Sequence, residues 1–283
     1  MQLKNIWVIF KKTVTAWQEH KASVWAAGIA FYTIFSLAPL LIIAITIAGA
    51  VFGQEVAENE LVGQIQGLIG KEGAEAIQAI IKNAQQPGSR GTIATIFGIV
   101  TLLFGASGIF GQLQEALNTV WNVKPKPGLN IKYFLQNRLL SFAMVLVISF
   151  LLLVSLIISA VLAGIANFFG HLFPGWIMIL QSLNFIISFS TTTFLFALIY
   201  KILPDIKIAW SNVWIGAIFA AILFTIGKLL IGLYLGNSGI SSSYGAASSF
   251  VIVLIWVFFS AQVLLFGAEF TQVYAKQKGN IAI

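Results

Sequence analysis

Residues Trp214–Leu235 (WIGAIFAAILFTIGKLLIGLYL) and Phe250–Phe270 (FVIVLIWVFFSAQVLLFGAEF) are two apolar runs, and they decide the fold of the chain. Each run has about 20 residues, the length at which a helix crosses the hydrocarbon core of a bilayer. A Gly/Ser-rich link over 236–249 separates them, so together they predict a transmembrane hairpin. Charged and polar side chains are costly inside a membrane and need a reason to be there. The hairpin carries three: Lys228, Gln262 and Glu269.

The overall composition also indicates a membrane protein. The chain has 283 residues, of which 59% are hydrophobic and 9% are charged, whereas about 25% are charged in typical soluble domains. It has too little polar surface to coat a soluble globule, so we expect a single membrane domain over 1–283. The sequence contains no cysteine, which excludes disulfides, thiolate metal sites and cysteine nucleophiles.

Four further apolar stretches predict an all-α protein with six transmembrane helices. The predicted spans are 24–52, 92–110, 139–168, 176–200, 214–235 and 250–270. Within the first of them, Pro39 predicts a helix kink, which serves either packing alone or a gating role.

Two segments outside the spans have amphipathic patterns. In residues 4–20, aromatic side chains and lysines recur at helical spacing on different sides. This pattern favours a helix lying on the membrane surface, with an ordinary solvated helix as the alternative. Residues 53–90 predict two short amphipathic helices that form an external cap between the first two spans.

The distribution of basic residues predicts the orientation. Six spans put both termini on one side, and that side carries twelve Lys and Arg residues, against three in the 53–90 cap. The positive-inside rule therefore predicts cytoplasmic termini in a bacterial-type cytoplasmic (inner) membrane. Anionic lipid headgroups at this face account for the net charge of +7, so we expect no nucleic-acid partner. The sequence leaves open whether the protein forms a homo-oligomer.

Several segments carry a family resemblance. They are Ala26–Leu40, Phe104–Trp121, Leu203-Pro204-Asp205, Gly216-Ala217 with Lys228 and Tyr234, Tyr244-Gly245-Ala246-Ala247 and Leu264–Phe270. Together they resemble the YihY/virulence factor BrkB family, over roughly residues 20–275. The resemblance implies a six-helix cytoplasmic-membrane protein without a settled activity. An older label for relatives, ribonuclease BN, makes a nuclease the rival hypothesis.

Lys228 and a polar stripe on the fourth span are candidates for a polar interior. Lys228 lies roughly 12 Å inside the outer end of its helix, as does Asn184 in the fourth span. If Lys228 faces inward, Asn184 or Gln181 can accept a hydrogen bond from it; the alternative is that its ammonium reaches the outer interface. The stripe either lines a pathway or joins helices. It consists of Gln181, Asn184, Ser188, Thr191 and Thr192.

Glu269 lies near the cytoplasmic end of the sixth span. One hypothesis is a structural ion pair with Arg138 or Lys201, and the other is a proton or cation site formed with Glu115. His20 and His171 fall on opposite sides of the predicted membrane and cannot share a metal or a catalytic triad. The pattern predicts no enzyme, metal or cofactor.

Two function hypotheses follow from these patterns. The first is a transporter or permeation pathway for a small solute, ion or lipid, lined by spans four to six and including Gln262. The second is a non-transporting envelope or scaffold protein that binds a partner through the external cap. Access of water to the polar stripe distinguishes the two.

Overall fold

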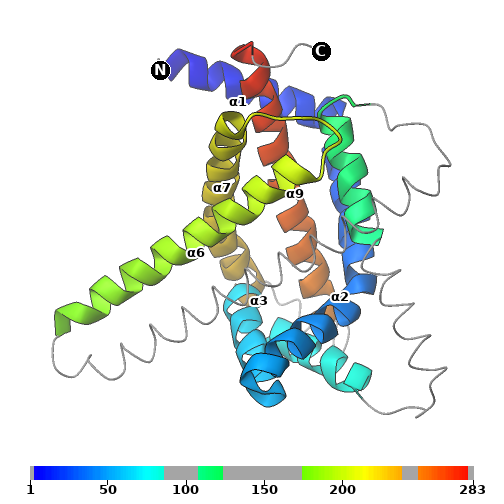
Figure 1. The fold of residues 1–283 in the computed structure, drawn as a ribbon, viewed down its shortest axis with the longest axis vertical. Coiled ribbons are helices and arrows are strands. Elements are labelled where there is room, and N and C mark those ends of the chain that lie inside the picture. Colours follow the sequence, from blue (N-terminus) through cyan, green and yellow to red (C-terminus); the bar gives the residue numbers. More distant parts are fainter. Residues whose placement is uncertain (1–2, 86–107, 124–173, 238–247, 280–283) are drawn as a thin grey trace.

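The computed structural model describes residues 3–85, 108–123, 174–237 and 248–279 (Figure 1). Within these ranges the ordered elements are all helices and there is no strand, which confirms the all-α prediction. A helical stretch over 108–120 accompanies six labelled helices. These are α1 (Leu3–Glu19), α2 (Ala22–Phe52), α3 (Gln54–Gln85), α6 (Pro174–Ile202), α7 (Trp210–Asn237) and α9 (Ser248–Gln277).

Three of the described helices are long and apolar enough to cross a membrane. They cover Met178–Ile202, Trp210–Tyr234 and Phe250–Gln277, in agreement with the predicted spans at 176–200, 214–235 and 250–270. One face of α7 shows why such helices need lipid. Its large apolar side chains recur every three or four residues and are between 43% and 66% exposed: Ile218, Ile222, Ile226, Leu229 and Leu233. A continuous apolar surface of this kind suits hydrocarbon rather than water.

The remaining predicted spans are only partly covered. The span at 24–52 falls within α2, which stays helical through Pro39; a kink at that residue stays a prediction. The span at 139–168 and most of the span at 92–110 lie outside the described residues. The count of six spans therefore also stays a prediction.

Helix α9 is the centre of the bundle. It packs against α1, α2, α3 and α7, while α6 packs against α7. Small residues occupy the crossing of α7 and α9, which lets the two backbones approach closely. The buried alanines include Ala217, Ala220 and Ala221 on α7 and Ala261 and Ala268 on α9. Close packing of this kind gives membrane helices contact energy that the hydrophobic effect does not supply inside lipid.

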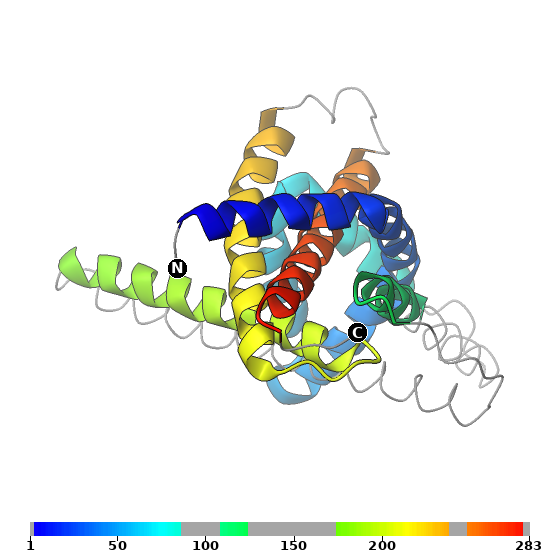
Figure 2. The ribbon, with the colours of Figure 1, turned by 90° about the horizontal axis from the view of Figure 1, so that it is seen from above.

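Helix α1 lies across the end of the bundle at which α9 ends, as two perpendicular views show (Figures 1 and 2). Its buried face includes Ile9 and Thr13, which are 2% and 0% exposed, and Ile9 packs with Val273 and Tyr274 of α9. Trp7, one of the aromatic residues of this helix, is 68% exposed. The helix thus packs one face against α9 and leaves Trp7 exposed. Its location on a membrane surface stays a prediction.

Helix α3 differs from the expectation of two short helices, because it is one element of 32 residues. Gly70 and Gly73 suggested a break between two helices. Each costs only about 1 kcal/mol in a helix interior, and tertiary packing offsets that cost. Ile77 and Ile81 pack with Ile45 of α2 and Trp256 of α9 in one apolar cluster. The segment therefore covers the end of the bundle opposite α1 (Figure 1).

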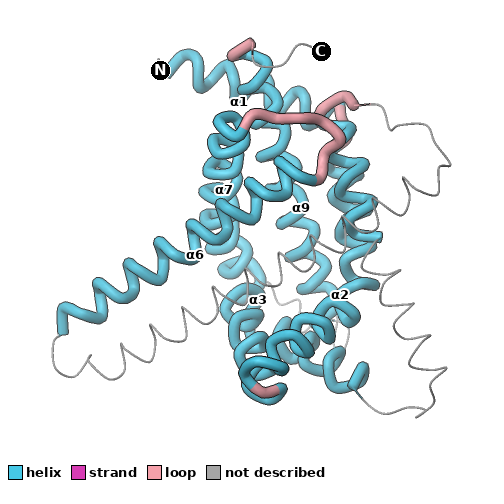
Figure 3. Tube along the Cα trace, viewed as in Figure 1, coloured by secondary structure: helices cyan, strands magenta, loops and turns pink. Residues whose placement is uncertain are grey.

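Most connections in the described part of the chain lie at the α1 end of the bundle (Figure 3). They include the turn between α1 and α2, the link over 203–209 between α6 and α7, and the turn that follows α9. Gly53, between α2 and α3, lies at the opposite end and has a φ of 89°, a conformation that glycine adopts without strain.

Candidate functional site

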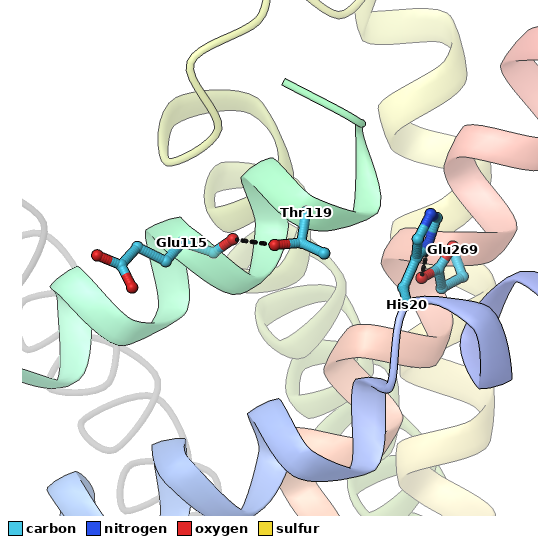
Figure 4. Close-up of polar contacts among 4 residues, drawn as sticks. All are labelled: His20, Glu115, Thr119 and Glu269. Atoms are coloured by element: carbon cyan, nitrogen blue, oxygen red, sulfur yellow. Dashed lines mark hydrogen bonds and ion pairs between the residues drawn. The ribbon is translucent and has the colours of Figure 1, made fainter. Parts of the chain in front are cut away.

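Glu269 is a fully buried carboxyl group on α9, with 0% of its surface exposed. Nδ1 of His20 lies 2.7 Å from its Oε1 atom, and the two side chains face each other (Figure 4). His20 occupies the turn between α1 and α2, where Lys21 has a left-handed backbone with a φ of 51°. An unpaired carboxylate is very costly to bury, so the histidine contact explains how α9 accommodates Glu269.

The partners that the sequence suggested for Glu269 lie elsewhere or outside the described residues. Lys201 donates a hydrogen bond to the carbonyl oxygen of Ile208 and lies 5.5 Å from the centre of the Trp210 ring. Glu115 is exposed, and its carboxylate points away from the His20–Glu269 pair (Figure 4). Arg138 lies outside the described residues. The structure thus gives Glu269 a partner, His20, that the sequence pattern did not predict for it.

A row of polar side chains follows one side of α9 at this end. Residues seven positions apart repeat after two helical turns, and residues three apart are neighbours. The row consists of Gln262, Glu269 and Gln272. In the described part of the chain, each of these side chains has one buried atom without a hydrogen-bond partner: Oε1 of Gln262, Oε2 of Glu269 and Nε2 of Gln272. Since proteins pair nearly all their buried polar atoms, this α9 polar row calls for an explanation.

The polar stripe on α6 lies in a different environment. Helix α6 packs against α7 with its C-terminal half, while its N-terminal half projects away from the bundle in both views (Figures 1 and 2). The buried residues of the packed half include Thr193, Ala197 and Tyr200. Of the predicted stripe, Thr191 and Thr192 are half-buried, whereas Gln181, Asn184 and Ser188 are exposed.

Lys228 is half-buried on α7. Asn184 and Gln181 belong to the half of α6 that leaves α7, so the helix pairing by itself does not bring them to Lys228. The contact between Lys228 and either residue stays a prediction. In the described part of the chain, no group of three or more His, Cys, Asp or Glu side chains is arranged to hold a metal ion.

A second polar contact joins the link after α6 to the helical stretch over 108–120. The backbone N–H of Asp205 donates to Oδ1 of Asn118 at 2.8 Å, and Nδ2 of Asn118 donates to Oδ2 of Asp205 at 2.9 Å. Gln114 donates to the other carboxylate oxygen at 3.2 Å. Asn118 is 4% exposed. These reciprocal bonds hold two segments that are far apart in the sequence.

Comparison with known proteins settles the family. A family model described as virulence factor BrkB matches residues 13–281. This chain belongs to the BrkB family. The segments that carried the resemblance meet in the structure, since Asn118 from one binds Asp205 from another. Tyr200 donates to the carbonyl oxygen of Leu264, within a third such segment, at 2.7 Å.

Curated relatives of this BrkB-family chain are named UPF0761 membrane proteins. The relative from Alteromonas mediterranea is 25% identical over 95% of this chain and 87% of its own length. Those from Aeromonas salmonicida and Haemophilus influenzae are each 28% identical, covering 90% and 95% of this chain and 84% and 94% of their own lengths. No solved structure matches the chain. The family and the apolar helices together make it a bacterial membrane protein.

Proposed function

We propose that this BrkB-family protein forms a transport or permeation pathway for a small solute, ion or lipid, with α9 as a lining helix and α6 and α7 beside it. The observation that carries the proposal is the α9 polar row, Gln262, Glu269 and Gln272, each with a buried atom that has no hydrogen-bond partner among the described residues. A pathway gives these atoms water or a permeating solute as partners.

The energetic argument favours a polar path over inert packing. A buried polar atom without a partner costs about 1–3 kcal/mol. Apolar residues of similar size at positions 262, 269 and 272 of α9 would avoid that cost at each position. Polar residues that persist in a membrane helix usually face a bundle interior or a hydrated cavity. Lys228, Ser188 and Thr191 are further candidates for lining the same path.

The proposal includes an orientation and partners. The protein lies in the inner membrane with both termini in the cytoplasm, and its basic residues face anionic lipid headgroups. Consistent with this orientation, α1 and the end of α9 lie at the same end of the bundle (Figure 1). The proposal assigns the chain neither a catalytic role nor a nucleic-acid partner.

Thiol accessibility tests the proposal, because the chain contains no cysteine. Gln262→Cys should react with a small charged thiol reagent in proteoliposomes, since a thiol needs water to ionise and react. Phe258→Cys is the matched control: it lies one helical turn away on α9 and is 36% exposed on an apolar surface. We expect Gln262→Cys to react faster than Phe258→Cys.

Two outcomes would count against a pathway. If a thiol at position 262 does not react with reagent added on either side of the membrane, water does not reach Gln262 and the proposed path is wrong. Equal reaction rates at 258 and 262 would show that the reagent reaches α9 from outside the bundle. Either result favours the scaffold alternative, in which α3 presents exposed residues such as Glu55 and Val56 to a partner.

A further inference from the structure

The contact between His20 and Glu269 lies at the turn that connects α1 to α2. His20 and Lys21 form the turn between α1 and α2, and the left-handed backbone of Lys21 sets the direction in which α1 leaves the bundle. From this turn α1 crosses over α9 (Figure 2). Apolar packing between α1 and α9 includes Ile9 and the ring of Phe10, whose centre lies 5.9 Å from that of Phe266 in an edge-on arrangement. A change in the His20–Glu269 contact therefore bears on whether α1 stays docked.

The His20–Glu269 contact contains one hydrogen bond and two groups that can each hold a proton. With one proton between them the pair has no net charge, whichever atom carries it. With no proton the pair is an anion, and with two protons it is a cation. Glu269 is fully buried and His20 is 16% exposed, so either net charge is unfavourable where the pair lies.

Among the residues that the structure describes, no further charged group forms an ion pair with His20 or Glu269. Lys276, on α9 itself, and Glu19, at the end of α1, are the other charged groups that act on Glu269, and both are exposed. Lys21 follows His20 in the turn and is also exposed. Oε2 of Glu269 has no partner in the described part of the chain. The net charge at this point of the α1–α9 contact is therefore set by the protonation of the pair.

We propose that His20 and Glu269 form a one-proton site that locks α1 onto α9. With one proton bound, α1 stays docked. Loss of that proton, or gain of a second one, gives the buried His20–Glu269 pair a net charge, and α1 then detaches from α9. Histidine as a residue type changes charge between about pH 5 and pH 8, so such a lock responds near neutral pH. The proposal concerns the position of α1 and does not depend on transport.

Detachment would change which surface α1 presents. Docked, it buries Ile9 and Thr13 against the bundle and leaves Trp7 68% exposed. Released, it is an amphipathic helix with apolar residues and lysines free to bind a lipid surface. The proton site thus gives the bundle end two arrangements of one helix.

Distance measurement between spin labels tests the lock in the full chain. Labels on Lys12→Cys of α1 and Gln277→Cys of α9 occupy exposed positions, and no native cysteine competes for the reagent. In nanodiscs we expect one narrow distance distribution near neutral pH. It should broaden and lengthen toward both about pH 3, below the ordinary pKa of a glutamate, and about pH 9, above the ordinary pKa of a histidine. An unchanged distribution over this range would overturn the proposal.

Two single variants separate the arms of the response. Glu269→Gln removes the negative state, so docking should persist at alkaline pH and still be lost at acid pH. His20→Asn keeps a donor near the position of Nδ1 and removes the positive state, so docking should persist at acid pH and be lost at alkaline pH. The double variant should keep one distance at every pH.

A purely structural contact predicts a different pattern. It would weaken docking in both single variants equally at every pH, with no opposite dependence on acid and alkaline pH. That result would overturn the proposal even if all variants fold. Far-ultraviolet circular dichroism at each pH confirms that helix content is kept, so that a distance change reports α1 rather than unfolding. The thiol test at position 262 is independent of these measurements.

Discussion

Two glycines show how single residues set the spacing of α7 and α9. A Cβ atom added at Gly267 of α9 would lie 2.3 Å from the hydroxyl of Tyr200 and 2.6 Å from Cβ of Ala220. A Cβ atom added at Gly216 of α7 would lie 1.7 Å from Oγ1 of Thr271. Both positions lack room for any side chain, because the facing helix occupies it. The tight crossing also holds Tyr200, which is fully buried, in place to donate to Leu264.

At this scale we predict that Gly267→Ala destabilises the protein by about 1–3 kcal/mol, the usual cost of overpacking a tight interior. The reason is that Ala220 belongs to the opposite helix and cannot rotate away. Denaturant or thermal unfolding in detergent measures the change. Gly232→Ala on α7 is the matched control, since nothing lies within 4 Å of its added Cβ atom. There the better helix propensity of alanine should be neutral or stabilising by up to about 1 kcal/mol. Equal stability of both variants would contradict the packing argument.

At the scale of elements, the Asn118–Asp205 contact joins the helical stretch over 108–120 to the link between α6 and α7. The amide oxygen of Asn118 accepts from the backbone N–H of Asp205, and its amide nitrogen donates to the carboxylate of the same residue. Next to this contact, Leu117, Val120 and Trp121 are buried in the main core. The polar contact orients the link, and the apolar side chains supply the contact area.

We predict that Asn118→Ala lowers the free energy of unfolding by about 1–3 kcal/mol, because it removes the partner of the Asp205 backbone N–H in a buried place. In a double-mutant cycle with Asp205→Ala, the two effects should be non-additive by about 0.5–3 kcal/mol. Thr119→Ala is the control: Thr119 is on the same helix, and its hydroxyl donates to the carbonyl oxygen of Glu115 one turn earlier, so the change should stay within about 0.5 kcal/mol. Additive effects at 118 and 205 would dismiss the coupling between these elements.

At the scale of the whole molecule, the two ends of the bundle differ. One end has α1, the link over 203–209 and the end of α9, and the other has α3 (Figures 1 and 3). The proposed orientation places the first end in the cytoplasm. It follows that the exposed lysines of α1 face anionic headgroups, while the glutamates of α3 face outward.

The orientation predicts opposite labelling of two exposed residues. Glu55→Cys on α3 should react with a membrane-impermeant thiol reagent in intact cells. Lys278→Cys, after the end of α9, should react only once the membrane is made permeable. Both native residues are exposed, so burial does not limit either reaction. Labelling at 278 and protection at 55 in intact cells would reverse the proposed topology.

The sequence by itself determined the features that depend on local pattern. Apolar runs of sufficient length predicted helices at 176–200, 214–235 and 250–270, and the helices observed there extend two to seven residues further at each end. Small residues and segments such as Leu203-Pro204-Asp205 pointed to the correct family. These features could be predicted because a helix in lipid must satisfy its own backbone hydrogen bonds, so length and hydropathy suffice to place it.

Only the tertiary structure decided which side chains meet. The partner of Glu269 is His20, which precedes it by 249 positions; depth along the predicted spans favoured Arg138 or Lys201, because a linear reading does not contain the turn at Lys21. Likewise, α3 is one helix because Ile77 and Ile81 pack on α2 and α9 and offset its glycines. Contacts between distant residues depend on helix directions and rotations, which are set jointly by packing and turns and not by any one segment.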